Sequence, residues 1–168
     1  MSDRRALDLA VIIVNYNSAT LLRTCLESLY RHPLRLGSMA VWVVDNASGD
    51  ESVQLVREEF PHVQLISNEN NLGFAAANNQ AIECTQSGHV LLLNPDTEMH
   101  DSTLDQMLQF MDDTPDAGAM GAQLINLGCF SFFEVFVTVP DQAYHTDVAR
   151  DIFLFLTNRD GRKPSSSN

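Results

Sequence analysis

The sequence contains a single lysine, Lys163, and its formal net charge is −12. A chain this acidic repels polyphosphate backbones, which argues against nucleic acid as a partner. The shortage of lysine also excludes a lysine-based phosphate cradle in the body of the protein. If a diphosphate binds here, its charge must be compensated by backbone N–H groups, a helix N-terminus, an arginine or a metal ion.

Cysteine is also scarce, and the three cysteines, Cys25, Cys84 and Cys129, have neither CxxC nor histidine spacing. An odd, dispersed set argues against a disulfide framework and a zinc site, and it fits a reducing cytoplasm. Cys25 falls in helical phase with Leu22, Leu26 and Leu29. We therefore expect Cys25 to be a small core residue.

Long apolar runs and dinucleotide motifs are missing too. No segment approaches the roughly 18 to 20 apolar residues of a membrane span, and residues 9–14 are too short for a signal-peptide core. The expected location is the cytoplasm, with peripheral contact to the inner face of the membrane left open.

No GxGxxG opens the first helix, which weighs against a redox dinucleotide enzyme. No glycine-rich loop bearing lysine or arginine follows the first strand, which weakens the hypothesis of a nucleotidyltransferase.

The sequence does contain a regular alternation of apolar strands and amphipathic helices. Strands that are apolar on both faces are typical of a parallel sheet covered on both sides. We predict that Asn17 or Ser18 caps the first helix and that Ser48 or Asp50 caps the second. The 168 residues thus predict an α/β protein with a mostly parallel sheet sandwiched by helices. The expected strands are residues 9–14, 41–44, 63–66, 89–93 and 119–125, and a helix follows each of the first four.

Each of the first four strands ends in a polar or acidic cluster. These clusters are residues 15–18, 45–50, 68–73 and 96–98. Because the carboxyl ends of parallel strands lie along one edge of the sheet, the four clusters are expected to form one site.

Asp96 is the residue of that site with the most specific chemical prediction, which is metal binding. Pro95 cannot donate a ladder hydrogen bond, so pairing ends there and Asp96 is delivered to the sheet edge. Asp96, together with Glu98, would suit Mg²⁺ or Mn²⁺ held against a diphosphate. The structural alternative is that Asp96 closes a turn or caps the helix that begins near Asp101.

Four motifs in register extend this expectation: VIIVNYNS at 11–18, VVDNASGD at 43–50, NNLGFAAANN at 70–79 and LLNPD at 92–96. Over about Leu9 to Asn126 they resemble the family 2 inverting glycosyltransferases, closest to the rhamnosyltransferase-like branch. The resemblance implies the N-terminal, nucleotide-binding half of a GT-A fold. It also implies a nucleoside-diphosphate sugar donor, linked to UDP, dTDP or GDP, and a divalent metal.

By position, the resemblance assigns Val14 and Tyr16 to the base pocket and Asp45 to the base or ribose. Gly73 and Asn78 would lie near the sugar-diphosphate, and Asp96 would bind the metal. Asn-Pro-Asp replaces two flanking aspartates in this motif, so a single protein carboxylate is expected to hold the metal. Simpler interpretations stay open. Asp45 could cap a helix, Tyr16 could pack on the strand ends, and Gly73 could be present only for the backbone conformation that it allows.

The resemblance ends after Asn126, and the catalytic residues remain unknown. We divide the chain into a nucleotide-sugar-binding part at 1–127, a divergent segment at 128–159 and a disordered tail at 160–168. In the divergent segment, residues 129–139 are expected to form an aromatic strand, and residues 148–156 a short apolar helix or strand. A second copy of the chain could cover the phenylalanine-rich part. None of its carboxylates has a context that identifies a general base.

The sequence therefore predicts a glycosyltransferase-like domain that transfers a sugar, with inversion and metal assistance, to a hydroxyl acceptor. The acceptor would be a polysaccharide or a lipid-linked glycan. The alternative is a truncated, non-catalytic remnant that binds nucleotide only, and a nucleotidyltransferase is the weaker third hypothesis.

Overall fold

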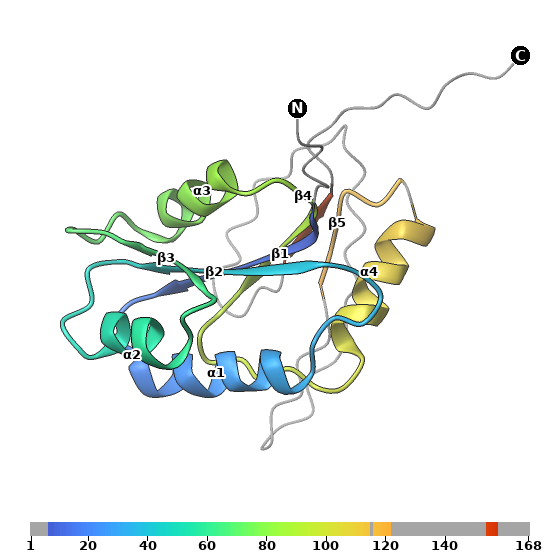
Figure 1. Cartoon of the computed structure of the whole chain (residues 1–168). Helices are drawn as coiled ribbons and strands as arrows, with labels where there is room; N and C mark the ends of the chain where they lie inside the picture. The colour runs from blue at the N-terminus through green and yellow to red at the C-terminus, as the bar shows by residue number, and fades with distance from the viewer. Residues whose placement is uncertain (1–6, 115, 122–153, 158–168) are drawn as a thin grey trace, which may run out of the picture.

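The computed structural model describes residues 7–114, 116–121 and 154–157, which form one sheet and four helices (Figure 1). The helices are α1 (Ala19–Arg31), α2 (Ser52–Glu59), α3 (Phe74–Cys84) and α4 (Thr103–Asp113). The strands are β1 (Leu7–Asn15), β2 (Met39–Asp45), β3 (Gln64–Ser67), β4 (Ser87–Leu93), β5 (Ala119–Met120) and β6 (Leu154–Thr157).

The sheet has the strand order β3-β2-β1-β4-β6-β5. β1 pairs in parallel with both β2 and β4, and β2 pairs in parallel with β3. β6 pairs antiparallel with β4 on one side and with β5 on the other. The predicted α/β class with a mostly parallel sheet is therefore confirmed.

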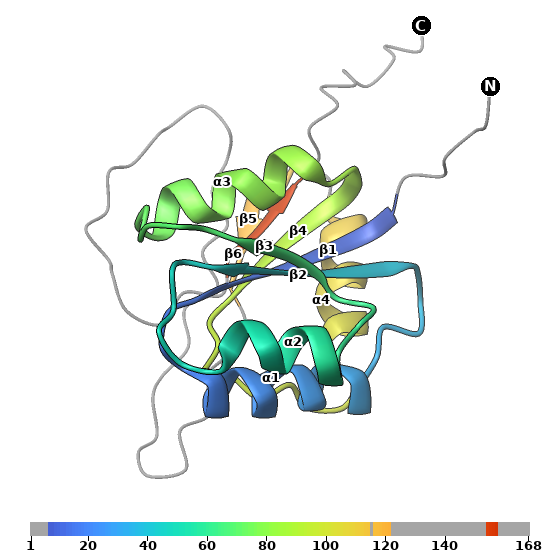
Figure 2. The same cartoon turned by 60° about the vertical axis from the view of Figure 1, so that its left-hand side comes forward.

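Helices cover both faces of the sheet. α1, α2 and α4 lie on one face and α3 lies on the other, as two views at 60° to each other show (Figures 1 and 2). α1 and α2 connect β1, β2 and β3 in one direction across the sheet, and α3 brings the chain back to β4. Because parallel crossovers are right-handed, this reversal places α3 on the opposite face. The strand order thus reverses between β1 and β4, the position where open α/β sheets bind ligands.

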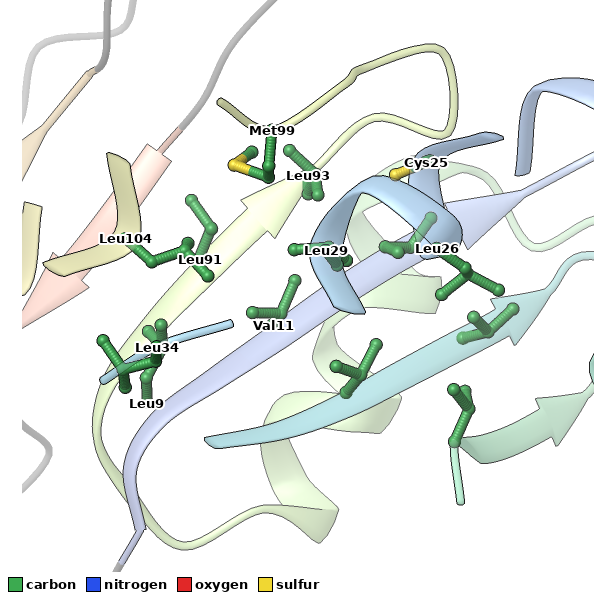
Figure 3. Packing of buried hydrophobic residues seen from close by; sticks show 14 of the residues in the cluster. Leu9, Val11, Cys25, Leu26, Leu29, Leu34, Leu91, Leu93, Met99 and Leu104 are labelled. Atoms are coloured by element: carbon green, nitrogen blue, oxygen red, sulfur yellow. The ribbon is translucent and has the colours of Figure 1, made fainter. Parts of the chain in front are cut away.

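The central strand and the first helix explain why the core forms. Residues 9–13 of β1 are fully buried, as expected for a strand covered on both faces. Figure 3 shows Leu29 of α1 beside Val11 of β1, and Cys25 and Leu26 of the same helix belong to the same buried cluster. The predicted helical stripe and the predicted core position of Cys25 are confirmed. On the other face, Ala77 and Ala81 of α3 pack on the sheet, and their small side chains let the helix approach closely.

The predicted caps differ in detail from the observed ones. Ser18 is the N-cap residue of α1, but its side chain forms no capping hydrogen bond. Instead, Asp50 Oδ2 accepts a hydrogen bond from the backbone N–H of Ala19 at 2.9 Å. The N-cap residue of α2 is Glu51, and Asp50 Oδ1 accepts from the N–H and hydroxyl of Ser52 at 3.1 and 2.5 Å. One carboxylate therefore serves both helices, because the loop after β2 folds against the loop after β1.

This double role makes Asp50 a source of pH-dependent stability. Burial opposes its ionisation, but the hydrogen bonds from Ser52 and Ala19 outweigh burial and hold the pKa of Asp50 below its ordinary 3.8. A lowered pKa gives stability that is present above the unfolded-state pKa and lost as the pH falls through the folded-state pKa. We expect Asp50→Ala to lower the free energy of unfolding by about 1–2 kcal/mol at pH 7, and by less at pH 3.

Urea unfolding at a series of pH values measures this effect. Glu51→Ala is the matched control, because Glu51 occupies the α2 N-cap position without a side-chain capping bond. Curves for wild type and Asp50→Ala that stay parallel from pH 7 to pH 3 would contradict the assignment.

The later part of the chain contributes two short strands. Within the predicted strand at 119–125, the structure places β5 at Ala119–Met120. Within the segment predicted as helix or strand at 148–156, residues from Leu154 onward form β6 between β4 and β5. The predictions for residues 129–139, for the oligomer contact there and for the tail lie outside the described residues. Among the described helices, none has the length and hydropathy needed to cross a membrane.

Candidate functional site

The polar clusters after the first three strands meet at one edge of the sheet. Asn15 pairs in register with Asp45, and Asp45 pairs with Ser67. β4 pairs with β1 in parallel, so the segment that carries Asp96 leaves the sheet at the same edge. The strand register therefore places the strand-end clusters at one edge of the sheet, as predicted.

A buried carboxylate organises the first two loops. Asp45 is only 1% exposed, and its Oδ1 accepts a hydrogen bond from Asn15 Nδ2 at 3.0 Å. Its Oδ2 accepts from the N–H of Ser48 at 3.0 Å. The Ser48 hydroxyl in turn accepts from the N–H of Asn17 at 2.9 Å. Asp45 thus fixes the two loops against each other.

A second network ties the end of β2 to the loop before α3. Asn46 Nδ2 donates to Asn71 Oδ1 at 2.8 Å and to the carbonyl of Gly73 at 3.4 Å. Asn46 Oδ1 accepts from the N–H of Leu72 at 3.0 Å and from Asn68 Nδ2 at 3.2 Å. All four hydrogen bonds of this buried amide therefore go to one loop. The sequence interpretation missed Asn46, and the only available signal was the number of asparagines at the strand ends.

The loop then enters α3 through Gly73. Its φ of 80° and ψ of 168° lie in a region that is essentially restricted to glycine. Inside the helix, Asn78 Nδ2 donates to the carbonyl of Phe74 at 2.9 Å. Its Oδ1 is buried, and no residue in the described ranges donates a hydrogen bond to it.

The residues assigned to a base pocket differ in exposure. Tyr16 directly follows β1 and is 52% exposed, so its ring is available for stacking. Val14 is half-buried on the α3 face of the sheet. Neither position tests the assignment, and the contacts of Val14, Tyr16, Asp45, Gly73 and Asn78 with a nucleotide stay predictions.

Asp96 lies at the corner of a tight turn after β4. The N–H of Thr97 donates to the carbonyl of Asn94 at 3.3 Å, which closes the turn around Pro95 and Asp96. Asp96 and Glu98 are both exposed. The N-cap residue of α4 is Ser102, so capping of that helix does not explain Asp96.

The Cys25 thiol contacts this turn from the core. Cys25 Sγ donates to the carbonyl of Asn94 at 3.7 Å. Burial, followed by the negative charge of Asp96, raises the pKa of Cys25 to about 12. The thiol therefore stays protonated near neutral pH and remains a hydrogen-bond donor.

The residues present can be compared with what a divalent ion needs. No group of three or more histidine, cysteine, aspartate or glutamate side chains in the described ranges could form a complete cage. Mg²⁺ commonly binds through one or two carboxylates and completes its coordination with substrate phosphates and water. An exposed Asp96, with Glu98 two residues later, fits such a substrate-completed site.

Comparison with known proteins settles the family. The family model described as glycosyl transferase family 2 matches residues 10–136, which is most of the chain and runs past Asn126. The chain belongs to glycosyl transferase family 2. Its membership confirms the resemblance carried by the four strand-end motifs.

Three similar proteins illustrate the relationship. The chain is 29% identical to glycosyltransferase YibD of Escherichia coli over 60% of this chain and 29% of that protein. It is also 29% identical to the N-acetylglucosaminyl-diphospho-decaprenol L-rhamnosyltransferase of Mycobacterium tuberculosis, over 67% of this chain and 40% of that protein. The structure of mannosyltransferase PcManGT from Pyrobaculum calidifontis, in complex with GDP-Man and Mn²⁺, superposes with a TM-score of 0.62. That match is 26% identical and covers 71% of this chain and 36% of PcManGT. The chain thus spans less than half the length of each.

Proposed function

We propose that this family 2 domain binds a nucleoside-diphosphate sugar at the carboxyl edge of the sheet and transfers the sugar, with inversion, to a hydroxyl acceptor. The single observation that carries the proposal is the meeting of the strand-end loops where the strand order reverses. Hydrogen bonds between polar side chains join the first three loops, and the fourth loop carries the exposed carboxylate of Asp96.

The nucleoside would be held by the end of β1 and the end of β2. The exposed ring of Tyr16 offers a stacking surface for the base, and Val14 offers an apolar contact. Within the described part of the chain, each oxygen of Asp45 accepts one hydrogen bond, which leaves a lone pair on each for a base N–H or a ribose hydroxyl.

The diphosphate needs positive charge, and the single lysine of the sequence, Lys163, lies outside the residues that match the family. The first N–H groups of α3, reached through Gly73, would meet part of that charge, and Gly73 and Asn78 would lie near the sugar-diphosphate. Asp96, with Glu98 close by, would hold Mg²⁺ or Mn²⁺ against the phosphates. When bound, the metal would supply Lewis-acid stabilisation of the departing nucleoside diphosphate.

The acceptor would be a polysaccharide or a lipid-linked glycan. This part of the proposal is supported by the relative from M. tuberculosis, whose name specifies a diphospho-decaprenol acceptor. Such an acceptor would bring the domain to the cytoplasmic face of a membrane as a peripheral protein. Inversion requires attack on C1 from the face opposite the leaving group, and a general base must take the proton of the acceptor hydroxyl.

Thermal-shift titration with UDP, dTDP and GDP, with and without Mn²⁺, tests this proposal. We expect one of these nucleotides to raise the Tm in a saturable manner, and more strongly with Mn²⁺ than with EDTA. At a ligand concentration of 100 times Kd, the stabilisation is about 2.7 kcal/mol. No stabilisation by any of the three would refute the proposal.

A turnover assay distinguishes an active glycosyltransferase from a domain that only binds nucleotide. The corresponding UDP-, dTDP- or GDP-sugars are incubated with the protein, and free nucleoside diphosphate is measured with and without a lipid-linked acceptor. Release that depends on the acceptor supports transfer. Tight metal-dependent binding without release would favour a domain that only binds nucleotide.

A further inference from the structure

The buried face of α1 contains one hydroxyl that core packing alone does not explain. Ser28 is 1% exposed and lies among the apolar residues of α1 that face the sheet. Burying a hydroxyl is unfavourable unless it forms hydrogen bonds. Ser28 Oγ donates to the carbonyl of Cys25 at 2.7 Å and accepts from the N–H of Met99 at 2.9 Å. The second bond joins α1 to the segment that carries Asp96 and Glu98.

The same helix also holds the other end of this segment. The Cys25 thiol donates to the carbonyl of Asn94, the same oxygen that accepts from Thr97 to close the turn. Met99 itself is buried in the core, close to Leu93 and α1 (Figure 3). Residues 94–99 are therefore anchored at both ends, and the two carboxylates project between the anchors.

We infer that Ser28 is a positioning residue that holds the Asp96–Glu98 segment in the geometry needed to bind a divalent metal. The inference rests on the proposed function, because it takes these carboxylates as the metal-binding acids. An exposed carboxylate on an unsupported loop would have to be ordered when the metal binds, and that ordering would weaken binding. Loss of groups that support metal ligands typically reduces metal affinity 10- to 100-fold.

The test compares three variants on the full chain. Ser28→Ala removes the acceptor for the Met99 N–H. Ser28→Thr is the conservative variant, since a helical threonine keeps an Oγ that can bond the preceding turn and still accept from Met99. Thr24→Ala is the matched control, because the Thr24 hydroxyl lies on the same helix and, among the residues described, donates to the carbonyl of Thr20 within that helix.

Two affinities are measured for each variant. One is the Mn²⁺ concentration that half-saturates the thermal shift at a fixed concentration of the nucleoside diphosphate that binds wild type. The other is the affinity for that nucleotide in EDTA. We expect Ser28→Ala to raise the Mn²⁺ requirement about 10-fold or more, with nucleotide affinity in EDTA within about twofold of wild type. Ser28→Thr should restore the Mn²⁺ requirement, and Thr24→Ala should leave it unchanged.

The outcomes separate this inference from the proposed function. If wild type binds nucleotide without any Mn²⁺ dependence, the metal site itself is refuted. If wild type depends on Mn²⁺ and Ser28→Ala responds as Thr24→Ala does, Ser28 is not a positioning residue, even if the Tm of the variant is lower. Amide hydrogen exchange at Met99 gives a readout without metal, and it should be faster in Ser28→Ala than in Ser28→Thr.

Discussion

Replacing Asp96 with alanine should abolish the Mn²⁺-dependent part of nucleotide binding while the fold remains intact. Asp96 is exposed at the corner of a turn and forms no hydrogen bond within the described part of the chain, so its removal exposes no buried partner. Its loss would leave Glu98 as the remaining nearby acid. We expect the apparent affinity for nucleotide in Mn²⁺ to fall about 100-fold, which is about 2.7 kcal/mol, and the affinity in EDTA to stay nearly constant.

Two further substitutions make this result specific. Glu98→Ala should cause a smaller loss if one protein carboxylate is sufficient, as the Asn-Pro-Asp motif suggests. Asp101→Ala removes another exposed carboxylate, which pairs with Arg35 at 2.7 Å outside the turn, and should leave Mn²⁺ dependence unchanged. Isothermal titration calorimetry with and without Mn²⁺ measures all three. If Asp96→Ala retains full Mn²⁺ dependence, the metal is bound elsewhere and the role given to this turn is wrong.

The sequence predicted the layers of the fold because they depend on patterns within short segments. Residues 9–14 are apolar on both faces, and this alone indicates a strand covered by helices on both sides. Short connections between alternating strands and helices then require parallel neighbours. The position of Asp96 at the sheet edge followed from Pro95, which ends strand pairing by its own covalent structure.

The polar contacts between loops could not be predicted in the same way. Asp50 was expected to act on the helix that follows it, but it also accepts from Ala19, 31 residues earlier. Asn46 and Ser28 likewise bond to residues far away in the sequence. Such contacts depend on how two connections pack in three dimensions, and hydrophobic periodicity carries no information on that packing. The placement of β6 between β4 and β5 is another long-range contact of this kind.

Replacing Asp45 with alanine should destabilise the protein more than any other change at the site. The substitution removes a buried charged acceptor from two donors, Asn15 Nδ2 and the N–H of Ser48. Hydrogen bonds to charged groups contribute about 1.5–3 kcal/mol each. Asn15 Nδ2 retains its contact with the Ser48 hydroxyl at 3.2 Å, so the loss should be partial on that side. We expect the free energy of unfolding to fall by about 3–5 kcal/mol in urea denaturation.

Asp45→Asn separates this structural role from a role in binding. An asparagine keeps one acceptor for the Ser48 N–H and has the same shape, so the loss of stability should be only about 1–2 kcal/mol. A nucleotide that donates to Asp45 would still lose its charged acceptor. Nucleotide affinity that falls at least about 10-fold in a folded Asp45→Asn variant would therefore support direct contact. Unchanged affinity, with the expected loss of stability, would limit Asp45 to joining the loops, and stability of Asp45→Ala within about 1 kcal/mol of wild type would contradict the network itself.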